Sequence, residues 1–397
     1  MAMRVLVAPL RYVQGPEALK ELGEQLQIFG IKNPLVLAPT EVRDLIGSTI
    51  AESLGSRGLA HAFLDFNGEC TWKEIERIKS ACMKGGHDAI INCGGGKTLD
   101  AGRCAASGAA TNVEKDPPEA FPKLGAGVPC INVPTIAATD ASTSAASLIY
   151  SDAGTVEATI IFPTNPTMVL VDTSVIARSP VRLLVSGMGD ALATYFEADM
   201  CHRTASPSLQ TNALSTRTAR ALGRLCFDLL MEHGVQAKRE AEAGLAGPGI
   251  EAIVEANVLL SGLGFESGGL SASHAVGQAF HYIRERFRRH LFHGELVGFG
   301  TLTQLVMEGR EPQFLDRIFG FCKAVGLPTT FEEMGLDGVT DAELEKVALA
   351  ASRDILIRSF VGAGEARDDL GRYFDHWEIL RCLKVADGYG HGWAARG

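Results

Sequence analysis

Residues 88–110 read DAIINCGGGKTLDAGRCAASGAA, and this stretch decides the fold class of the 397-residue chain. Its opening segment, 88–93, is short and rich in apolar and β-branched side chains, which predicts a buried strand. Its closing segment, 101–110, consists mainly of small residues and predicts a helix. The same alternation continues on both sides, with strands predicted at 4–8, 35–38, 62–66, 128–133 and 168–172 and helices at 17–29, 40–54 and 71–84. Alternating strands and helices are typical of a parallel sheet with crossover helices, so we expect an α/β first half.

The glycine run Gly94-Gly95-Gly96 lies between the predicted strand and the predicted helix. In that position backbone N–H groups can reach an anionic ligand, and the dipole of the following helix favours negative charge. Pyrophosphate is the ligand that such a turn suits best, with Lys97 adding a positive charge and Asp100 ordering the loop. Glycine runs also occur in simple turns, so both readings are open at this stage.

Three segments after this run are less regular. Residues 111–127 are rich in proline, glycine and charge and predict a surface excursion. Residues 134–144, PTIAATDASTS, place short hydroxyl side chains beside one acid, either as a polar lining at the edge of the sheet or as a Ser/Thr-rich turn. Residues 147–150 and 155–162 predict a hairpin at the border of the sheet.

The second half has a different periodicity. Beyond Pro180 the strand-like runs give way to helical patterns, with helices predicted at 212–233, 250–266 and 296–325 and a loose tail at 388–397. We therefore expect two domains, an α/β domain at 1–178 and a helical domain at 179–397, as the chain length also suggests.

Composition narrows the class of function. A formal net charge of −10 argues against a general binder of nucleic acid or of a membrane surface, because such proteins carry an excess of Lys and Arg. The nine cysteines form no CxxC pair, which favours a reducing compartment over a disulfide framework. The N-terminal residues contain no apolar run of signal-peptide length. We expect a soluble cytoplasmic protein that acts on small molecules.

Histidines concentrate in residues 271–306, SASHAVGQAFHYIRERFRRHLFHGELVGFGTLTQLV, where four of the ten fall between His274 and His293. On one straight helix those two side chains would lie about 28 Å apart. If both bind one divalent cation, the chain must turn between them. Asp190, in GMGDALATYFEA, is a third candidate, and one carboxylate with two imidazoles suits zinc or ferrous iron with a coordination position left open. Glu295 would serve as a first-turn acid or as an acceptor behind a ligand.

Several blocks of the sequence together resemble the glycerol dehydrogenases of the iron-containing alcohol dehydrogenase superfamily. These blocks are YVQGPEAL, GGGKTLD, VPTIAATDASTSAASLIYSDAG, GMGDALATYFEA, SGLGFESGGLSASHAV and HGELVGFGTLTQLV, in this order. The resemblance implies an N-terminal nucleotide-binding α/β domain, a C-terminal helical domain as in dehydroquinate synthase, and an active site in the cleft between them. It also implies a homo-oligomer.

The resemblance further implies a role for individual residues. Gly94, Gly95, Gly96, Lys97 and Thr98 would hold the pyrophosphate of NAD, and Thr135, Ala138, Ser144, Ala146 and Tyr150 would line the rest of the dinucleotide groove. Asp140 would hydrogen-bond the hydroxyls of a polyol substrate. Asp190, His274 and His293 would hold the metal, zinc by resemblance and ferrous iron as the alternative. The implied reaction is hydride transfer from glycerol or a related small polyol to NAD, giving dihydroxyacetone.

Three features depart from the family pattern. The acid that usually follows the second strand and binds the adenosine ribose is replaced by Pro39, which leaves NADP open beside NAD. Gly277 stands where a further histidine is frequent, and residues 111–127 resemble an insertion. The basic run at 284–289 favours a second interpretation, a dehydrogenase for a polyol phosphate or hydroxy acid, unless it forms a solvated helix face. A lyase of the dehydroquinate synthase type is a third interpretation.

Overall fold

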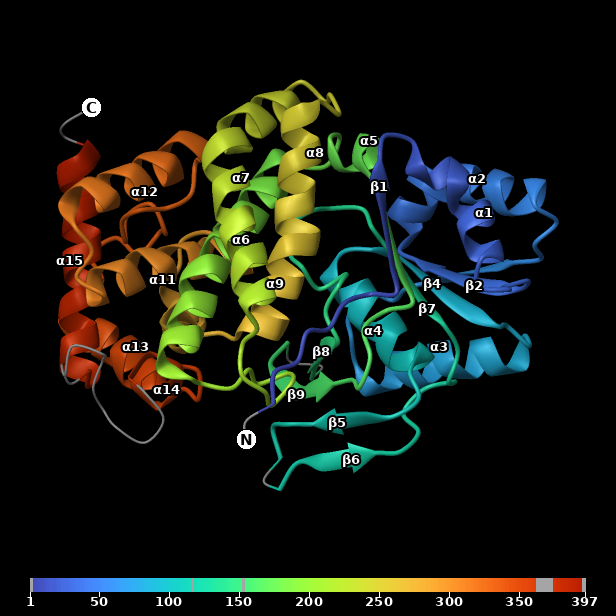
Figure 1. The fold of residues 1–397 in the computed structure, drawn as a ribbon, viewed down its shortest axis with the longest axis horizontal. Helices are drawn as coiled ribbons and strands as arrows, with labels where there is room; N and C mark the ends of the chain where they lie inside the picture. Colours follow the sequence, from blue (N-terminus) through green and yellow to red (C-terminus); the bar gives the residue numbers. More distant parts are fainter. Residues whose placement is uncertain (1–2, 116, 152–153, 362–373, 395–397) are drawn as a thin grey trace. The chain divides into compact units, whose positions relative to one another are not determined.

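The computed structural model describes residues 3–115, 117–151, 154–361 and 374–394. It divides into an α/β unit, Val7–Ser179 with Ala243–Gly247, and a helical unit, Met1–Leu6 with Pro180–Glu242 and Pro248–Gly397. Both units are therefore built from separated parts of the chain. The predicted fold class, a parallel sheet followed by a helical half, is confirmed (Figure 1).

The described part of the α/β unit contains a six-stranded parallel sheet in the order β1-β10-β7-β4-β2-β3. Its strands are β1 Arg11–Gly15, β2 Pro34–Ala38, β3 Ala62–Asp65, β4 Ala89–Gly94, β7 Cys130–Pro134 and β10 Met168–Asp172. One face is covered by a 3-10 helix at Ala18–Glu21, by α1 Leu22–Gln27 and by α2 Thr40–Ser56, and the other by α3 Trp72–Lys84 and α4 Gly96–Ala106 (Figure 1). Every strand runs parallel, so all carboxyl ends lie at one edge, where ligands of such sheets bind.

Helix α3 forms for the reasons that its sequence indicates. The Thr71 hydroxyl accepts a hydrogen bond from the Glu74 backbone N–H at 3.2 Å and caps the helix. Ile75, Ile78 and Cys82 recur at helical spacing, and all three side chains are buried against the sheet. The helix ends at Lys84, as predicted, and Gly85 is its C-cap.

The strand predicted at 4–8 is wrong. Arg4 makes only an isolated bridge to Leu214, and the first strand of the sheet is β1. The physical reason lies at the end of β10, where the Asp172 carboxylate accepts backbone N–H groups of Glu17 at 3.0 Å and Leu19 at 3.2 Å. These bonds fix Gly15 beside Asp172, so the residues that pair with β10 come just before them.

Further boundaries also differ from the predictions. Helix α4 starts at Gly96 and ends at Ala106, because Gly95 is its N-cap and the last glycine of the run is already helical. The predicted excursion at 111–127 contains paired strands rather than irregular chain. A four-stranded antiparallel sheet in the order β6-β5-β9-β8 comprises β5 Ala110–Asn112, β6 Glu119–Phe121, β8 Ala146–Tyr150 and β9 Val156–Ile161. The predicted hairpin thus belongs to this second sheet and not to the border of the first.

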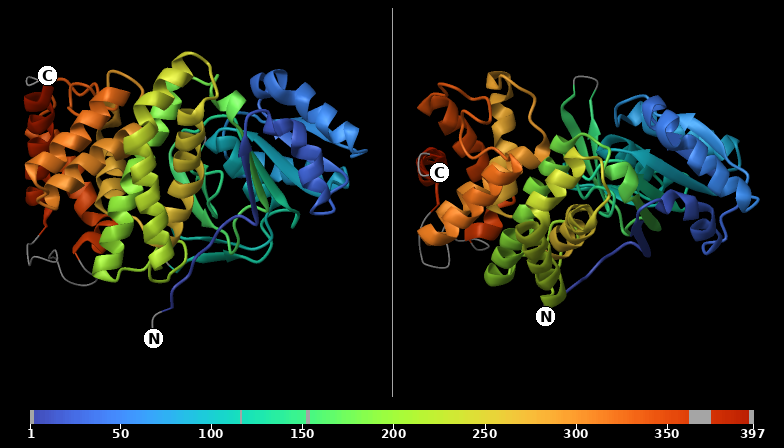
Figure 2. Two further views of the ribbon diagram at one scale, coloured as in Figure 1. Left: turned by 45° about the horizontal axis from the view of Figure 1, so that its top comes forward. Right: turned by 90° about the horizontal axis from the view of Figure 1, so that it is seen from above.

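The helical unit is built around α6 Val181–Thr204, α7 Arg217–Glu242 and α9 Ser261–Gly268, which pack side by side (Figures 1 and 2). Its other helices are α8 Pro248–Val254, a π-helix at Glu255–Leu260, α10 Ala272–Ala279, a 3-10 helix at Phe280–Arg286, α11 His293–Met307, α12 Pro312–Val325, α13 Asp341–Arg353, α14 Ile357–Val361 and α15 His376–Ala394, while α5 Thr173–Ile176 belongs to the α/β unit. The tail predicted from residue 388 is wrong up to Ala394, which is still helical, and 395–397 lie outside the described residues. None of the helices in the described ranges has both the length and the apolar character needed to cross a lipid bilayer.

Candidate metal centre and dinucleotide site

Three predicted ligands converge within the helical unit. The Asp190 Oδ1 atom lies 3.4 Å from His274 Nε2 and 3.6 Å from His293 Nε2. One ligand atom from each residue lies within 4.8 Å of the other two. A cation bound to all three at about 2.0–2.2 Å fits such a spacing after small side-chain adjustments.

Separate helices supply these side chains. Asp190 lies in the middle of α6, His274 lies in the first turn of α10, and His293 is the first residue of α11. Between the histidines the chain leaves helical geometry at Ile283 and again at 287–292. The predicted turn between His274 and His293 is confirmed, and it brings together residues that a single helix would hold far apart.

Glycines allow α6 and α11 to approach closely enough for this convergence. A Cβ atom on Gly294 would lie 1.8 Å from the Ser186 carbonyl oxygen, and one on Gly189 would lie 2.2 Å from the Gly294 carbonyl oxygen. Backbone atoms cannot yield as a flexible side chain can, so both positions need glycine. Gly189 precedes Asp190 and Gly294 follows His293 in the chain, so the close contact of the two glycines brings His293 and Asp190 together.

Glu197 holds the His274 ring on the side away from Asp190, a role that was not predicted from the sequence. Its Oε2 atom accepts a hydrogen bond from His274 Nδ1 at 2.6 Å, and its Oε1 atom accepts the backbone N–H groups of His274 at 2.9 Å and Ser271 at 2.8 Å. With the Nδ1 proton held by Glu197, Nε2 is the free ligand atom that faces Asp190. Glu197 follows Asp190 by seven residues, two helical turns, and this spacing on one face of α6 was the available signal.

The electrostatics of the cluster favour a cation. Burial opposes the charged form of His274, but Glu197 and Asp190 outweigh it and raise the pKa of His274 well above its ordinary value. Burial likewise opposes the charged form of Asp190, and His293 and His274 outweigh it and lower the pKa of Asp190. Two buried carboxylates thus face one another across His274, and a divalent cation bound there would take the place of a proton on this imidazole.

The chemistry of the donor set fits zinc or ferrous iron. Two imidazole nitrogens and one carboxylate oxygen are the ligands that both ions accept, and three protein ligands leave a position for another molecule. The His293 side chain is 46% exposed, whereas the side chains of Asp190 and His274 are 6% and 11% exposed. His293 is therefore the most accessible of the three candidate ligands.

Glu295 is a capping acid rather than a support for His293. Its carboxylate accepts the Phe292 backbone N–H at 2.8 Å and forms two 2.8 Å contacts with Arg182. Glu295 therefore acts as an acid of the first helical turn of α11 and not as an acceptor behind a metal ligand.

Two arginines of the basic run at 284–289 form ion pairs with acids outside the cluster. Arg286 Nε lies 2.6 Å from Glu343, and Arg288 Nη1 lies 3.0 Å from Asp337. These guanidinium groups are neutralised by acids of the same unit. Arg286 ends a 3-10 helix, whereas Arg288 lies beyond it in exposed, non-helical chain, so the expected solvated helix face is wrong for Arg288.

In the α/β unit the glycine run forms a tight cradle at the carboxyl end of β4. A Cβ atom on Gly94 would lie 2.7 Å from Thr98 Oγ1, and one on Gly95 would lie 3.0 Å from Ile136 Cδ1. Since Gly95 is the N-cap and has no side-chain cap, the first N–H groups of α4 face this cradle. The Lys97 ammonium lies 2.6 Å from Glu69 and 5.8 Å from the centre of the Tyr150 ring. The residues thus fit the phosphate interpretation.

The remaining predicted groove residues also belong to this unit. The Thr135 backbone N–H donates to the Gly94 carbonyl at 3.1 Å, so the end of β7 lies beside the cradle. The backbone carbonyl of Asp140 accepts the Thr143 N–H at 3.0 Å. Ala138 and Ser144 lie in the segment between β7 and β8, and Ala146 and Tyr150 are the first and last residues of β8.

Asp100 was expected to order the glycine loop, but its carboxylate instead links α4 to β8 of the second sheet. Its carboxylate accepts the Leu148 backbone N–H at 3.2 Å and pairs with Arg103 at 3.1 Å. Burial raises the pKa of Asp100 to about 6, against the effect of Arg103. The acid therefore acts behind the cradle and not inside it.

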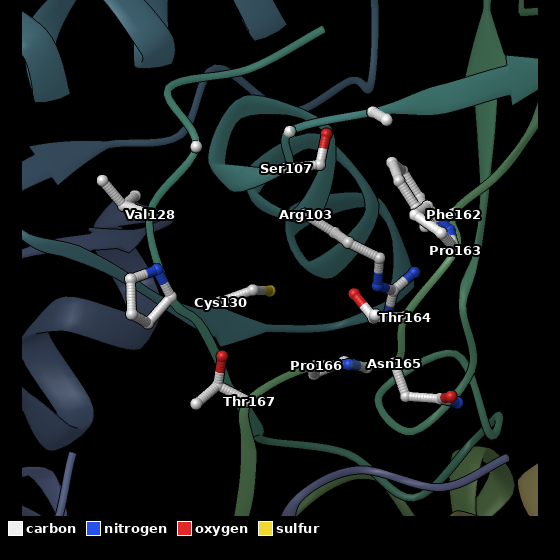
Figure 3. Close-up of a pocket in the computed structure, with 14 residues that line it drawn as sticks. Arg103, Ser107, Val128, Cys130, Phe162, Pro163, Thr164, Asn165, Pro166 and Thr167 are labelled. Atoms are coloured by element: carbon white, nitrogen blue, oxygen red, sulfur yellow. The ribbon is translucent and has the colours of Figure 1, made fainter. Parts of the chain in front are cut away.

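Figure 3 shows a pocket of about 380 Å³ in the α/β unit, lined among others by Arg103, Cys130, Thr164 and Thr167. It lies at the amino ends of the parallel strands, because Cys130 begins β7 and Thr167 precedes β10. The Gly94 cradle lies at the carboxyl edge, so this pocket is distinct from the predicted dinucleotide groove.

Comparisons with known proteins agree with the geometry. Residues 9–173 match the family model described as iron-containing alcohol dehydrogenase. The glycerol dehydrogenase of Citrobacter freundii is 37% identical over 99% of this chain and 100% of its own length, and that of Thermotoga maritima is 42% identical over 97% of each. The crystal structure of glycerol dehydrogenase from Schizosaccharomyces pombe superposes with a TM-score of 0.87 at 32% identity, covering 100% of this chain and 93% of that one.

Proposed function

The chain belongs to the iron-containing alcohol dehydrogenase family, and on that premise we propose that it is a metal-dependent polyol dehydrogenase that oxidises the secondary hydroxyl of glycerol with NAD, giving dihydroxyacetone. One observation carries the proposal: Asp190, His274 and His293 offer three ligand atoms within 4.8 Å of one another. The relatives named above are glycerol dehydrogenases, and the match to this chain extends over nearly their full length, which supports a polyol as the substrate.

The helical unit supplies the metal ligands. Asp190, His274 and His293 would hold zinc, with ferrous iron as the alternative, and Glu197 would keep the proton of His274 on Nδ1. A divalent cation there supplies a Lewis acid that stabilises the alkoxide of a substrate, and NAD supplies the hydride acceptor.

The α/β unit would supply the dinucleotide groove. Gly94, Gly95, Gly96, Lys97 and Thr98 would bind the pyrophosphate through backbone N–H groups and the Lys97 charge. The groove would continue along Thr135, Ala138, Ser144, Ala146 and Tyr150. Asp140 would accept a hydrogen bond from a substrate hydroxyl, which orients the carbinol carbon for hydride transfer.

The experiment that tests the function is a substrate panel. The protein is stripped of metal with a chelator, reloaded with zinc or ferrous iron, and assayed with glycerol, 1,2-propanediol, glycerol phosphate and a hydroxy acid, each with NAD and NADP. We expect the highest kcat/KM for glycerol or 1,2-propanediol and no turnover before reloading. Preferred oxidation of the anionic substrates contradicts the proposal.

A substitution of Glu197 tests the support of His274. Glu197→Gln is expected to weaken zinc binding roughly 10-fold to 100-fold, because Gln holds the Nδ1 proton less strongly and carries no charge. The zinc dissociation constant is measured by competition with a fluorescent chelator. Asp199→Asn is the matched control, since Asp199 is a buried acid on the same helix that faces Arg220 at 2.6 Å instead. Equal weakening in both variants would reject the role of Glu197.

Substitutions in the basic run test the anionic-substrate alternative. Arg286→Ala and Arg288→Ala are expected to change kcat/KM for glycerol by less than about twofold, because both guanidinium groups form surface ion pairs of small energy. Steady-state kinetics with glycerol and with glycerol phosphate measure this. A large rise in KM for the phosphate alone would instead assign the run to substrate binding.

We infer a homo-oligomer in a reducing, cytoplasmic compartment. All nine cysteines are free and buried, which is typical of such a compartment. Sedimentation of the purified protein gives the subunit number.

A further inference from the structure

The carboxyl edge of the sheet offers a second charged feature beside the glycine cradle. The register aligns Asn92 of β4 with Leu37 of β2, and Leu37 with Leu64 of β3. Gly94, the last residue of β4, and Pro39, the residue after β2, therefore lie at the same level, one strand spacing apart. Asp65 ends β3 about two spacings, or roughly 10 Å, from the cradle. A dinucleotide with its pyrophosphate at Gly94 extends its adenosine ribose over this distance.

Dinucleotide-binding sheets generally place an acid where the 2′-hydroxyl of that ribose lies, or an arginine where a 2′-phosphate lies. In this chain Pro39 follows β2 and offers neither group, and it serves as the N-cap of α2. Two charged residues lie close to this position: Asp65, directly opposite Ala38 in the register, and Arg43, one turn into α2, whose backbone N–H donates to the Pro39 carbonyl at 2.9 Å.

Asp65 and Arg43 form an ion pair. Arg43 Nη1 lies 2.6 Å from Asp65 Oδ1, and the two side chains are 36% and 50% exposed, so a ligand can reach them. Arg77 donates to the backbone carbonyl of Asp65, but its charge is already matched by the Glu74 carboxylate at 2.6 Å. Glu41, in the exposed first turn of α2, adds a further negative charge.

We propose that Asp65 is the residue that selects NAD over NADP in this protein. Its carboxylate accepts a hydrogen bond from the 2′-hydroxyl of the adenosine ribose, in place of the acid missing at position 39. The Arg43 charge is neutralised by Asp65 and is not available to a 2′-phosphate. A 2′-phosphate would also meet Asp65 and Glu41, two like charges. The inference deepens the proposed function and rests on it.

Equilibrium binding to the metal-free protein tests the inference without turnover. The dissociation constants of NAD and NADP, and of the fragments 5′-AMP and 2′,5′-ADP, are measured by calorimetry. For the wild type we expect NAD to bind at least about tenfold more tightly than NADP, as expected for a hydrogen bond to a charged group. Asp65→Asn removes the charge and releases Arg43, so the ratio of the two dissociation constants is expected to move towards NADP by about tenfold or more.

Two further variants separate the causes. In the double variant Asp65→Asn with Arg43→Ala, the gain in NADP binding is expected to disappear, because no released guanidinium remains. Glu24→Gln is the matched control: Glu24 pairs with Arg57, the C-cap residue at the far end of α2, and its side chain is equally exposed at 50%. This control is expected to leave the ratio unchanged.

The outcomes are distinguishable from a failure of the proposed function. If the wild type binds NAD but Asp65→Asn leaves the NAD-to-NADP ratio within twofold, Asp65 does not select the dinucleotide and the inference is overturned alone. If the wild type binds neither dinucleotide nor its fragments, the proposed dinucleotide function is itself wrong. Melting temperatures of all variants, each expected within about 2 °C of the wild type for an exposed pair, confirm that folding is retained.

Discussion

His274→Ala and His293→Ala are each expected to lower kcat/KM for glycerol by about a thousandfold or more, even after chelation and reloading with excess zinc or ferrous iron. A thousandfold loss corresponds to roughly 4 kcal/mol, within the range that a Lewis acid contributes to the stabilisation of developing charge. Removing one imidazole leaves two ligands on separate helices, which do not hold a cation tightly. Metal content by atomic absorption and kcat/KM are measured on the same samples.

The control for these variants is a histidine of the same unit outside the cluster. His233 lies on α7, where its ring is 3.7 Å from Glu232. His233→Ala is expected to keep both metal content and turnover. Full turnover of either cluster variant after reloading would show that these histidines do not hold a catalytic metal.

Gly294→Ala is expected to unfold or displace the start of α11. The added Cβ atom would lie 1.8 Å from the Ser186 carbonyl oxygen, so either α6 or α11 must move. Overpacking against a backbone costs about 3 kcal/mol, which corresponds to a fall in melting temperature of roughly 6–12 °C for a unit of this size. Because His293 is the preceding residue, bound zinc is expected to be lost as well. Calorimetry and metal analysis measure the two effects.

The same helix offers a matched control one turn later. A Cβ atom on Gly298 would approach Gly189 Cα only to 3.5 Å, which is ordinary contact. Gly298→Ala is therefore expected to leave zinc bound and to stabilise the helix slightly, by up to about 1 kcal/mol. A similar loss of stability in both variants would show that helix packing at Gly294 is not the cause.

The sequence predicted the parallel sheet because β2, β4, β7 and β10 are short, apolar and buried, and such runs have few alternatives. The prediction failed at 4–8, because a short apolar run such as RVLVA looks the same whether the segment pairs in the sheet or not. Only the long-range bonds of Asp172 to Glu17 and Leu19 decide the register. Similarly, 111–127 were read as irregular because the short strands β5 and β6 have no pattern of their own.

The residues of the candidate metal site could be predicted from the sequence, but their arrangement in space could not. The clustering of His274 and His293 indicated a shared cation, and Asp190, an acid in a helical stretch of small residues, was the third candidate. The role of Glu197 depends on a hydrogen bond across 77 positions of the chain, from α6 to α10, which local patterns do not encode. The Arg43–Asp65 pair likewise follows from strand register, and only the missing acid at Pro39 was visible beforehand.

The interleaved path of the chain limits how the protein can be dissected. Met1–Leu6 belong to the helical unit, where the Leu214 N–H donates to the Met3 carbonyl at 3.0 Å and Arg4 donates to the Ser215 carbonyl at 2.6 Å. Ala243–Gly247 belong to the α/β unit although they connect α7 and α8. A gene cut at residue 179 would therefore remove a native segment from each half. Expressing the halves separately is a poor route to soluble fragments, and a purification tag at the amino terminus adds its mass to the helical unit.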